Sequence, residues 1–195
     1  MRRSDPVLAG IIERVGPCCI EYRKPDFTAL ARAIVYQQLN GTAAGSIYRR
    51  VAALVAGGSR RTTTLRPEAV LQAPPRRLRA AGLSAAKVKY LRDLAQKTVS
   101  GAVRFRGLPA MSDEEVIAEL TQVHGIGVWS AHMFLIFALR RPDVLAVGDY
   151  GVRSAVKKAY GLERLPAPLE LERIAGPWRP HASTACWYLW QSLKA

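Results

Sequence analysis

The chain has 195 residues and is 49% hydrophobic, which is enough to bury the core of one compact domain or of two small lobes. Its 29 Lys and Arg residues outnumber 15 Asp and Glu residues, so the net charge is +14. Such a surface attracts polyanions, and nucleic acid ranks ahead of an anionic membrane as the expected partner. No stretch approaches the roughly twenty apolar residues of a membrane span, and no apolar signal core follows the start, so no membrane partner is expected.

Cysteine and histidine spacing argues against a metal centre built from side chains. The residues concerned are Cys18, Cys19, Cys186, His124, His132 and His181. None of their spacings is that of a zinc site, and adjacent cysteines are poorly placed to pair with each other. Reduced thiols are therefore expected, as in the cytoplasm.

Apolar residues recur with helical periodicity along most of the chain, whereas alternating strand patterns are scarce. The sequence therefore predicts an all-α fold. The expected helices cover residues 26–38, 43–55, 67–71, 75–81, 85–98, 112–123, 128–139, 149–160 and 180–193. The polar stretch 60–66 is expected to form a loop.

Several of these helices carry capping residues at their ends. Ser84 precedes the helix from residue 85, and Asp149 stands at the start of the helix that Gly161 follows. Ser112 and Glu115 have the spacing of a capping box, in which each side chain accepts a hydrogen bond from the other residue's backbone N–H.

The most informative stretch, residues 120–131, reads as a helix, a glycine hairpin and a second helix. Gly125 and Gly127 are two apart, so their N–H groups can approach a phosphate that a Cβ would obstruct. The positive start of the helix at Val128 adds to the attraction. About twenty residues later, Val147-Gly148-Asp149-Tyr150 places one carboxylate at the start of another helix.

Together these motifs resemble the helix-hairpin-helix DNA glycosylases, and within them 3-methyladenine DNA glycosylase II and its yeast-type relatives. The matching segments are residues 34–39, 82–84 with Lys87, 123–131, 147–150, and 177–180 with Trp187 and Tyr188. The resemblance implies an all-α, two-lobed fold with the active-site cleft between the lobes. One lobe is expected at 24–141 and the other at 1–23 with 142–195, with no N-terminal β domain.

Asp149 is the expected catalytic residue. Cleavage of an N-glycosidic bond leaves positive charge on the sugar, which a nearby carboxylate stabilises while it orients the attacking water. A helix N-terminus suits such an anionic stabiliser better than a general acid. The alternative is that Asp149 only caps its helix, the commonest task of an aspartate in that place.

The resemblance implies a base pocket formed by Trp129, Trp187, Tyr36 and Met133, whose aromatic faces attract cationic alkylated purines. Trp129 stands where the lyase branch of the superfamily has a nucleophilic lysine, which implies a monofunctional enzyme that uses water. Met133 replaces a pocket tyrosine of the type II enzyme, so the pocket is less aromatic. The alternative for Trp129, and more so for Trp190, is ordinary core packing.

The resemblance also implies DNA contacts and a cation site. Gln38 matches the wedge residue that fills the gap left by a flipped nucleotide, although a buried helix glutamine is the alternative. Further DNA contacts are expected from Gly125, Gly127 and Ser130, and His124 replaces a proline that stiffens the hairpin. The main-chain carbonyls of Thr121, Val123 and Ile126 are expected to hold a monovalent cation, Na⁺ or K⁺. No cofactor is required, and the four-cysteine iron–sulfur loop of some relatives is absent.

The sequence thus predicts a DNA repair glycosylase that excises 3-methyladenine and 7-methylguanine from double-stranded DNA. The nucleotide must be flipped out, because the glycosidic bond is hidden inside a duplex. Alternatives are a glycosylase, with or without lyase activity, for oxidised or deaminated bases, and a non-catalytic helix-hairpin-helix module. A monomer is expected, in the cytoplasm of a bacterium and bound to the nucleoid through DNA.

Overall fold

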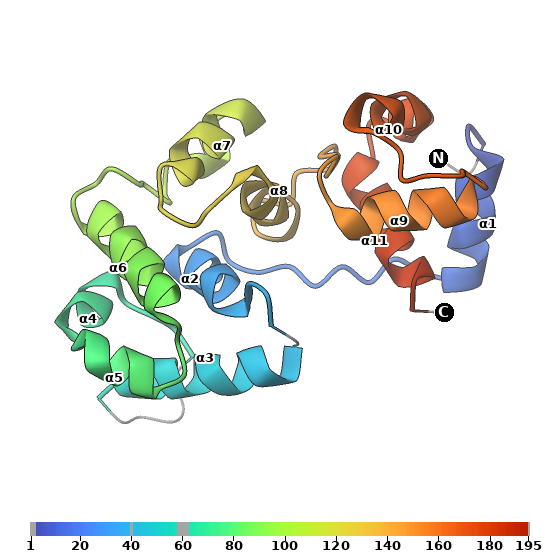
Figure 1. Ribbon diagram of the computed structural model, residues 1–195. Coiled ribbons are helices and arrows are strands. Elements are labelled where there is room, and N and C mark those ends of the chain that lie inside the picture. Colours follow the sequence, from blue (N-terminus) through green and yellow to red (C-terminus); the bar gives the residue numbers. More distant parts are fainter. Residues whose placement is uncertain (1–2, 40, 58–62, 195) are drawn as a thin grey trace. The chain divides into compact units, whose positions relative to one another are not determined.

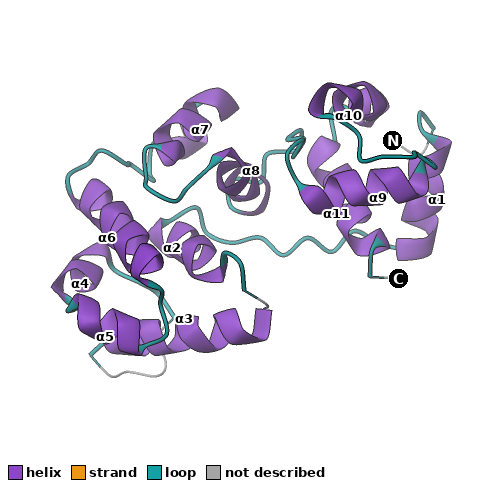
Figure 2. Ribbon diagram, viewed as in Figure 1, coloured by secondary structure: helices purple, strands orange, loops and turns teal. Residues whose placement is uncertain are grey.

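The computed structural model describes residues 3–39, 41–57 and 63–194. The described residues form helices joined by loops and contain no strand, so the predicted all-α class is confirmed (Figures 1 and 2). The helices are α1 Pro6–Val15, α2 Phe27–Tyr36, α3 Gly41–Val55, α4 Pro67–Gln72, α5 Pro75–Ala80, α6 Ala85–Val99, α7 Asp113–Thr121, α8 Val128–Phe137, α9 Tyr150–Ala159, α10 Pro168–Ala175 and α11 Ala182–Ser192, with short 3-10 helices at Leu108–Ala110 and Gly176–Trp178. None of the described helices combines the length and apolarity that a membrane crossing requires.

The helices differ from the sequence prediction mainly at their ends. α2 stops at Tyr36 rather than at residue 38, and α8 stops at Phe137 rather than at residue 139. The helices α1 and α10 were not predicted. The predicted loop at 60–66 lies partly outside the described residues.

The predicted caps are confirmed. The Ser84 hydroxyl accepts a hydrogen bond from the Lys87 N–H (3.2 Å) at the start of α6. The Ser112 hydroxyl accepts from the Glu115 N–H (3.2 Å), and Glu115 accepts from the Ser112 N–H (2.7 Å), so the capping box is complete. Local sequence thus predicts a helix start well where the cap is a hydrogen bond between residues three apart.

The chain forms two compact units, the central unit (Arg23–Phe134) and the terminal unit (Met1–Tyr22 with Leu135–Ala195). The sequence boundary was set at Pro142, where the helical pattern ends, whereas the structure divides the chain within α8. The end of a helix in the sequence therefore need not coincide with the border between two compact units.

In the central unit, α2 packs against α3 and α6, and α6 packs against α4. Fully buried residues such as Leu30, Ile34 and Leu91 supply the apolar contacts. The Lys87 ammonium donates to the Val35 carbonyl (2.8 Å) and the Gln37 carbonyl (2.6 Å) at the end of α2. Burial lowers the pKa of Lys87, and its charge lies at the helix end where the dipole is negative.

In the terminal unit, α11 packs against α9 and α1, and Asp5 ties the elements together. One oxygen of this buried carboxylate accepts from the N–H groups of Val7 and Leu8 (both 3.0 Å), which caps α1. The other oxygen accepts from the indole of Trp178 (2.7 Å) and from the hydroxyl of Tyr160. Burial raises the pKa of Asp5, but these donors outweigh burial and hold the pKa below its ordinary value.

We expect Asp5→Ala to lower the free energy of unfolding by about 3 kcal/mol at pH 7, because buried donors lose a charged acceptor. Ser84→Ala removes a single exposed cap and is expected to cost about 1 kcal/mol. Urea denaturation of both variants measures the difference. Equal costs would show that Asp5 acts only as a cap.

The cost of Asp5→Ala is also expected to depend on pH. Because the folded-state pKa of Asp5 is lowered, its stabilisation is fully present above the unfolded value and is lost as the pH falls through the folded one. The difference between wild type and Asp5→Ala should therefore shrink below about pH 4. A constant difference down to pH 2.5 would contradict this assignment.

Candidate functional site

The glycine hairpin lies between α7 and α8, and its two glycines serve different ends. Gly125 has a φ of +81°, and a Cβ there would lie 2.2 Å from the ring of Tyr90, so the fold itself requires glycine. A Cβ at Gly127 would meet no described atom within 4 Å. Packing within the described chain therefore does not explain the glycine at position 127, and the approach of a ligand to its backbone stays a prediction.

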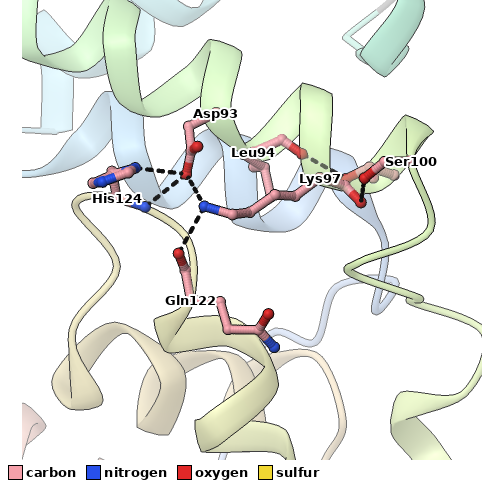
Figure 3. A network of polar contacts seen from close by, with 7 residues as sticks. Asp93, Leu94, Lys97, Ser100, Gln122 and His124 are labelled. Atoms are coloured by element: carbon pink, nitrogen blue, oxygen red, sulfur yellow. Dashed lines mark hydrogen bonds and ion pairs between the residues drawn. The ribbon is translucent and has the colours of Figure 1, made fainter.

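A single carboxylate oxygen fastens the hairpin to α6. Oδ2 of Asp93 accepts from the Lys97 ammonium (2.7 Å) and from the backbone N–H of His124 (2.8 Å) (Figure 3). The Lys97 ammonium also donates to the Gln122 carbonyl (2.8 Å). Burial raises the pKa of Asp93, but the hydrogen bonds from Lys97 and His124 outweigh burial and place the pKa below its ordinary value.

His124 gives the hairpin a contact that the proline of the resembled family does not offer. Its backbone N–H donates to Asp93, and its imidazole Nδ1 lies 3.1 Å from the same oxygen. Proline has no N–H, so it cannot make the first of these bonds. The departure from the family pattern therefore exchanges the rigidity of a ring for a hydrogen bond to α6.

Gln37 and Gln38, which follow the last residue of α2, behave differently. The Gln37 amide donates to the Gly125 carbonyl (2.8 Å) and so supports the hairpin. Gln38 is exposed and has a φ of +55°, in the left-handed region. The alternative of a buried helix glutamine therefore does not describe Gln38, which stays the candidate wedge.

A cavity of about 770 Å³ in the central unit collects most of the residues predicted to touch DNA or the base. It is lined by Tyr36, Gln38, Gly125, Trp129, Ser130 and Met133, with Ala33, Gln37, Leu39 and Tyr90. Trp129 is 47% exposed, which core packing does not explain. The structure therefore brings six predicted residues together. Tyr90, which the sequence analysis did not single out, joins them because it lies against Gly125.

The ring of Tyr36 is already in contact with a cation. The guanidinium carbon of Arg32 lies 3.9 Å from the ring centroid. One aromatic surface of the predicted pocket is therefore partly engaged by the protein itself, and Trp129 offers the more exposed ring.

Asp149 is held by two hydrogen bonds that converge on one oxygen. Oδ1 accepts from the Val152 N–H (2.7 Å), which caps α9, and from the indole N–H of Trp190 (2.8 Å). Only 8% of the residue is exposed. A Cβ at Gly151 would lie 3.0 Å from both Oδ1 of Asp149 and Cδ1 of Trp190, so glycine makes room for the pair. Asp149 therefore does cap α9, as the alternative interpretation expected. The hydrogen bond from Trp190 is an additional contact that a cap does not need.

The two tryptophans of α11 have different surroundings. Trp187, predicted to line the pocket, is 9% exposed and packs edge-on against Tyr188 with ring centroids 5.0 Å apart. Trp190, read as a core residue, orients Asp149 and stacks on Phe137 at 5.8 Å. A buried indole N–H needs an acceptor, but no sequence pattern indicates that α11 packs against α9 and supplies one.

The predicted site residues come from both compact units. Asp149 and Trp187 belong to the terminal unit, whereas Tyr36, Trp129 and Met133 belong to the central unit. The predicted cation ligands lie at the hairpin: Thr121 ends α7, and the Val123 carbonyl accepts from the Ile126 N–H (3.0 Å).

Two helices joined by a glycine hairpin form a helix-hairpin-helix element, the class of DNA-binding motif that the sequence predicted. Residues 31–180 match the HhH-GPD superfamily of base excision DNA repair proteins, and the chain belongs to this superfamily. The match covers the hairpin and Asp149.

Relatives and solved structures agree with this assignment. DNA-3-methyladenine glycosylase 1 of Schizosaccharomyces pombe is 32% identical over 173 residues, which cover 88% of this chain and 74% of that protein. The crystal structure of DNA-3-methyladenine glycosidase from Bacillus halodurans has a TM-score of 0.84 at 35% identity, covering 97% of this chain and 85% of that chain. The S. pombe 3-methyladenine DNA glycosylase in complex with abasic DNA also has a TM-score of 0.84, at 31% identity, covering 98% and 93%.

We expect Gly125→Ala to destabilise the protein by about 2–4 kcal/mol, because it adds left-handed strain and an overlap with Tyr90. Gly127→Ala is expected to change stability by less than about 0.5 kcal/mol, because its Cβ meets nothing. Urea unfolding of the two variants tests this. Similar losses at both positions would mean that the hairpin needs glycine at 127 for its own fold.

Proposed function

We propose that the chain is a monofunctional DNA glycosylase of base excision repair that hydrolyses the N-glycosidic bond of alkylated purines, 3-methyladenine and 7-methylguanine. It acts as a monomer on double-stranded DNA that contains the damaged base. The observation that carries this proposal is the buried carboxylate of Asp149, held by the Val152 and Trp190 N–H groups inside the region that matches the superfamily. The relatives named 3-methyladenine glycosylases support the choice of substrate.

The carboxylate acts on the sugar of the flipped nucleotide. As the bond from C1′ to the base nitrogen breaks, positive charge grows on the deoxyribose, and Asp149 stabilises that charge. The base departs with the bonding electrons, which neutralise its own charge, a water oxygen bonds to C1′, and the proton of that water passes to the solvent. The hydrogen bonds from Val152 and Trp190 keep the carboxylate oxygen in one place throughout.

An alkylated purine suits such a mechanism because its own positive charge makes it a good leaving group. Cationic bases are attracted to aromatic faces by up to about 2 kcal/mol when water is excluded. The half-exposed Trp129 supplies such a face in the central cavity, and the polarizable thioether of Met133 lines the same space.

The hairpin and Gln38 act on the DNA rather than on the bond. The N–H groups of Gly125 and Gly127 bind a backbone phosphate, and Gln38, exposed at the same cavity, fills the gap left by the flipped nucleotide. The net charge of +14 supplies the long-range attraction to the duplex.

A monovalent cation fits the end of α7. The carbonyls of Thr121, Val123 and Ile126 form an oxygen donor set of the kind that binds Na⁺ or K⁺, at a helix end where the dipole is negative. The Val123 carbonyl accepts one hydrogen bond and retains a second lone pair. When bound, the cation adds positive charge beside the phosphate, and no step of hydrolysis passes through it.

We expect Asp149→Asn to lower the single-turnover rate of base release from methylated DNA by at least about 100-fold, because the variant keeps the helix cap but loses the charge. Trp190→Phe removes the indole N–H but keeps the ring stack, so a loss of about tenfold is expected. Binding to undamaged duplex should stay unchanged in both. Near wild-type release by Asp149→Asn would remove the basis of the proposal.

We expect borohydride to trap no covalent complex with methylated DNA, because Trp129 provides no amine for a Schiff base. The product strand should stay intact until alkali is added. A lyase trapped under the same conditions is the positive control. A complex trapped with this protein would instead favour the alternative of a bifunctional enzyme for oxidised bases.

A further inference from the structure

A second cavity of the central unit, of about 690 Å³, has no part in the mechanism above. It lies beside α2 and α3 and is strongly cationic. Its charged lining residues are Arg23, Lys24, Asp26, Arg32 and Arg49. Four cations therefore stand against one carboxylate, and an uncompensated cluster of this kind favours an anionic ligand.

Arg32 is held in this cavity by aromatic rings. Its guanidinium carbon lies 3.9 Å from the ring centroid of Tyr36 and 5.3 Å from that of Tyr48. The guanidinium thus lies against aromatic surface, and a guanidinium carries N–H groups in its plane that can donate to another acceptor.

No described residue supplies that acceptor. The hydrogen bonds and ion pairs of the described chain include none from the Arg32 guanidinium, and no buried side-chain nitrogen there lacks a partner. The N–H groups of Arg32 are therefore open to solvent, although the residue as a whole is half-buried. An incoming ligand can reach them.

Among the charged residues described in the lining, Asp26 is the one carboxylate and stands against four cations. Asp26 caps α2 by accepting from the Ala29 N–H (3.0 Å). Tyr48 donates its hydroxyl to the Thr63 carbonyl (2.6 Å), and burial raises its pKa to about 12, so it is neutral. The described lining of the cavity thus keeps an excess of positive charge.

We propose that this cavity is a second phosphate-binding site, in which Arg32 holds a phosphate through paired N–H groups and Arg49 adds a second positive charge. A guanidinium fixed in one plane matches two phosphate oxygens at once. The phosphate belongs either to the backbone of bound DNA or to a free nucleotide. Tyr36 lines this cavity and the hairpin cavity alike, which favours the backbone of a duplex bound at the hairpin. The assignment of the phosphate to DNA rests on the proposed function, whereas the phosphate site itself does not.

The first experiment measures binding of undamaged duplex against salt concentration. We expect Arg49→Ala and Arg32→Gln each to weaken binding about tenfold and to reduce the log–log salt slope by about one. Arg76→Ala, an exposed arginine of the same unit outside the cavity, is the matched control and should leave the slope unchanged. Arg49 is exposed, so Arg49→Ala remains informative even if Arg32→Gln fails to fold.

The second experiment titrates inorganic phosphate and dAMP into isotope-labelled protein. Shifts of the backbone amides of Thr42 and Gly45, which line the cavity, are expected in wild type and not in Arg32→Gln or Arg49→Ala. Amide shifts in wild type, together with an unchanged salt slope of duplex binding in the cavity variants, would assign the site to free nucleotides. A slope change specific to the cavity variants would assign it to DNA.

Two results would overturn the proposal. One is equal loss of duplex binding in Arg49→Ala and Arg76→Ala with no amide shifts, which would indicate general surface charge. The other is no effect in either experiment. Both readouts are independent of base release, so wild-type protein that binds phosphate here but releases no methylated base would contradict only the glycosylase assignment.

Discussion

The position of the hairpin depends on one face of α6. Tyr90, Asp93 and Lys97 are three and four residues apart, so they lie on the same side of the helix. Tyr90 lies against Gly125. Asp93 accepts hydrogen bonds from the N–H of His124 and from the ammonium of Lys97 (Figure 3). The hairpin backbone, which is predicted to contact DNA, is therefore held by a packed ring and a hydrogen-bonded carboxylate on α6 as well as by its own short turn.

The terminal unit uses one arrangement twice. Asp5 and Asp149 are both buried helix caps, and each accepts an indole N–H, from Trp178 and Trp190 respectively. In Asp5 both oxygens are engaged by donors that join distant parts of the unit, which suits a structural role. In Asp149 the bonds from Val152 and Trp190 converge on Oδ1. An indole donor beside a helix cap thus allows a carboxylate to be buried. What separates Asp149 from Asp5 is that Asp149 lies within the residues that match the superfamily.

Local sequence patterns predicted what depends on neighbouring residues. The all-α class, the capping box at Ser112 and the glycine hairpin follow from spacings of a few residues. Trp190 and Arg32 were missed because their roles come from the packing of helices far apart in sequence, which periodicity does not reveal. The end of α2 was placed too late because the Lys87 ammonium, fifty residues away, binds the carbonyls there. Gly127 and Gln38 remain predictions that rest on the family resemblance and on their exposed, unpacked positions.

Tyr36 is a wall common to the two cavities of the central unit. A guanidinium lies over its ring, and the same ring is a candidate surface for a charged base. An anion that neutralises Arg32 would make the ring a better partner for a second cation, and a cation on the ring would make the anion bind more tightly. Thermodynamic linkage requires the two effects to be equal in size. If the proposed anion and base sites are both used, this one side chain would couple their occupancies.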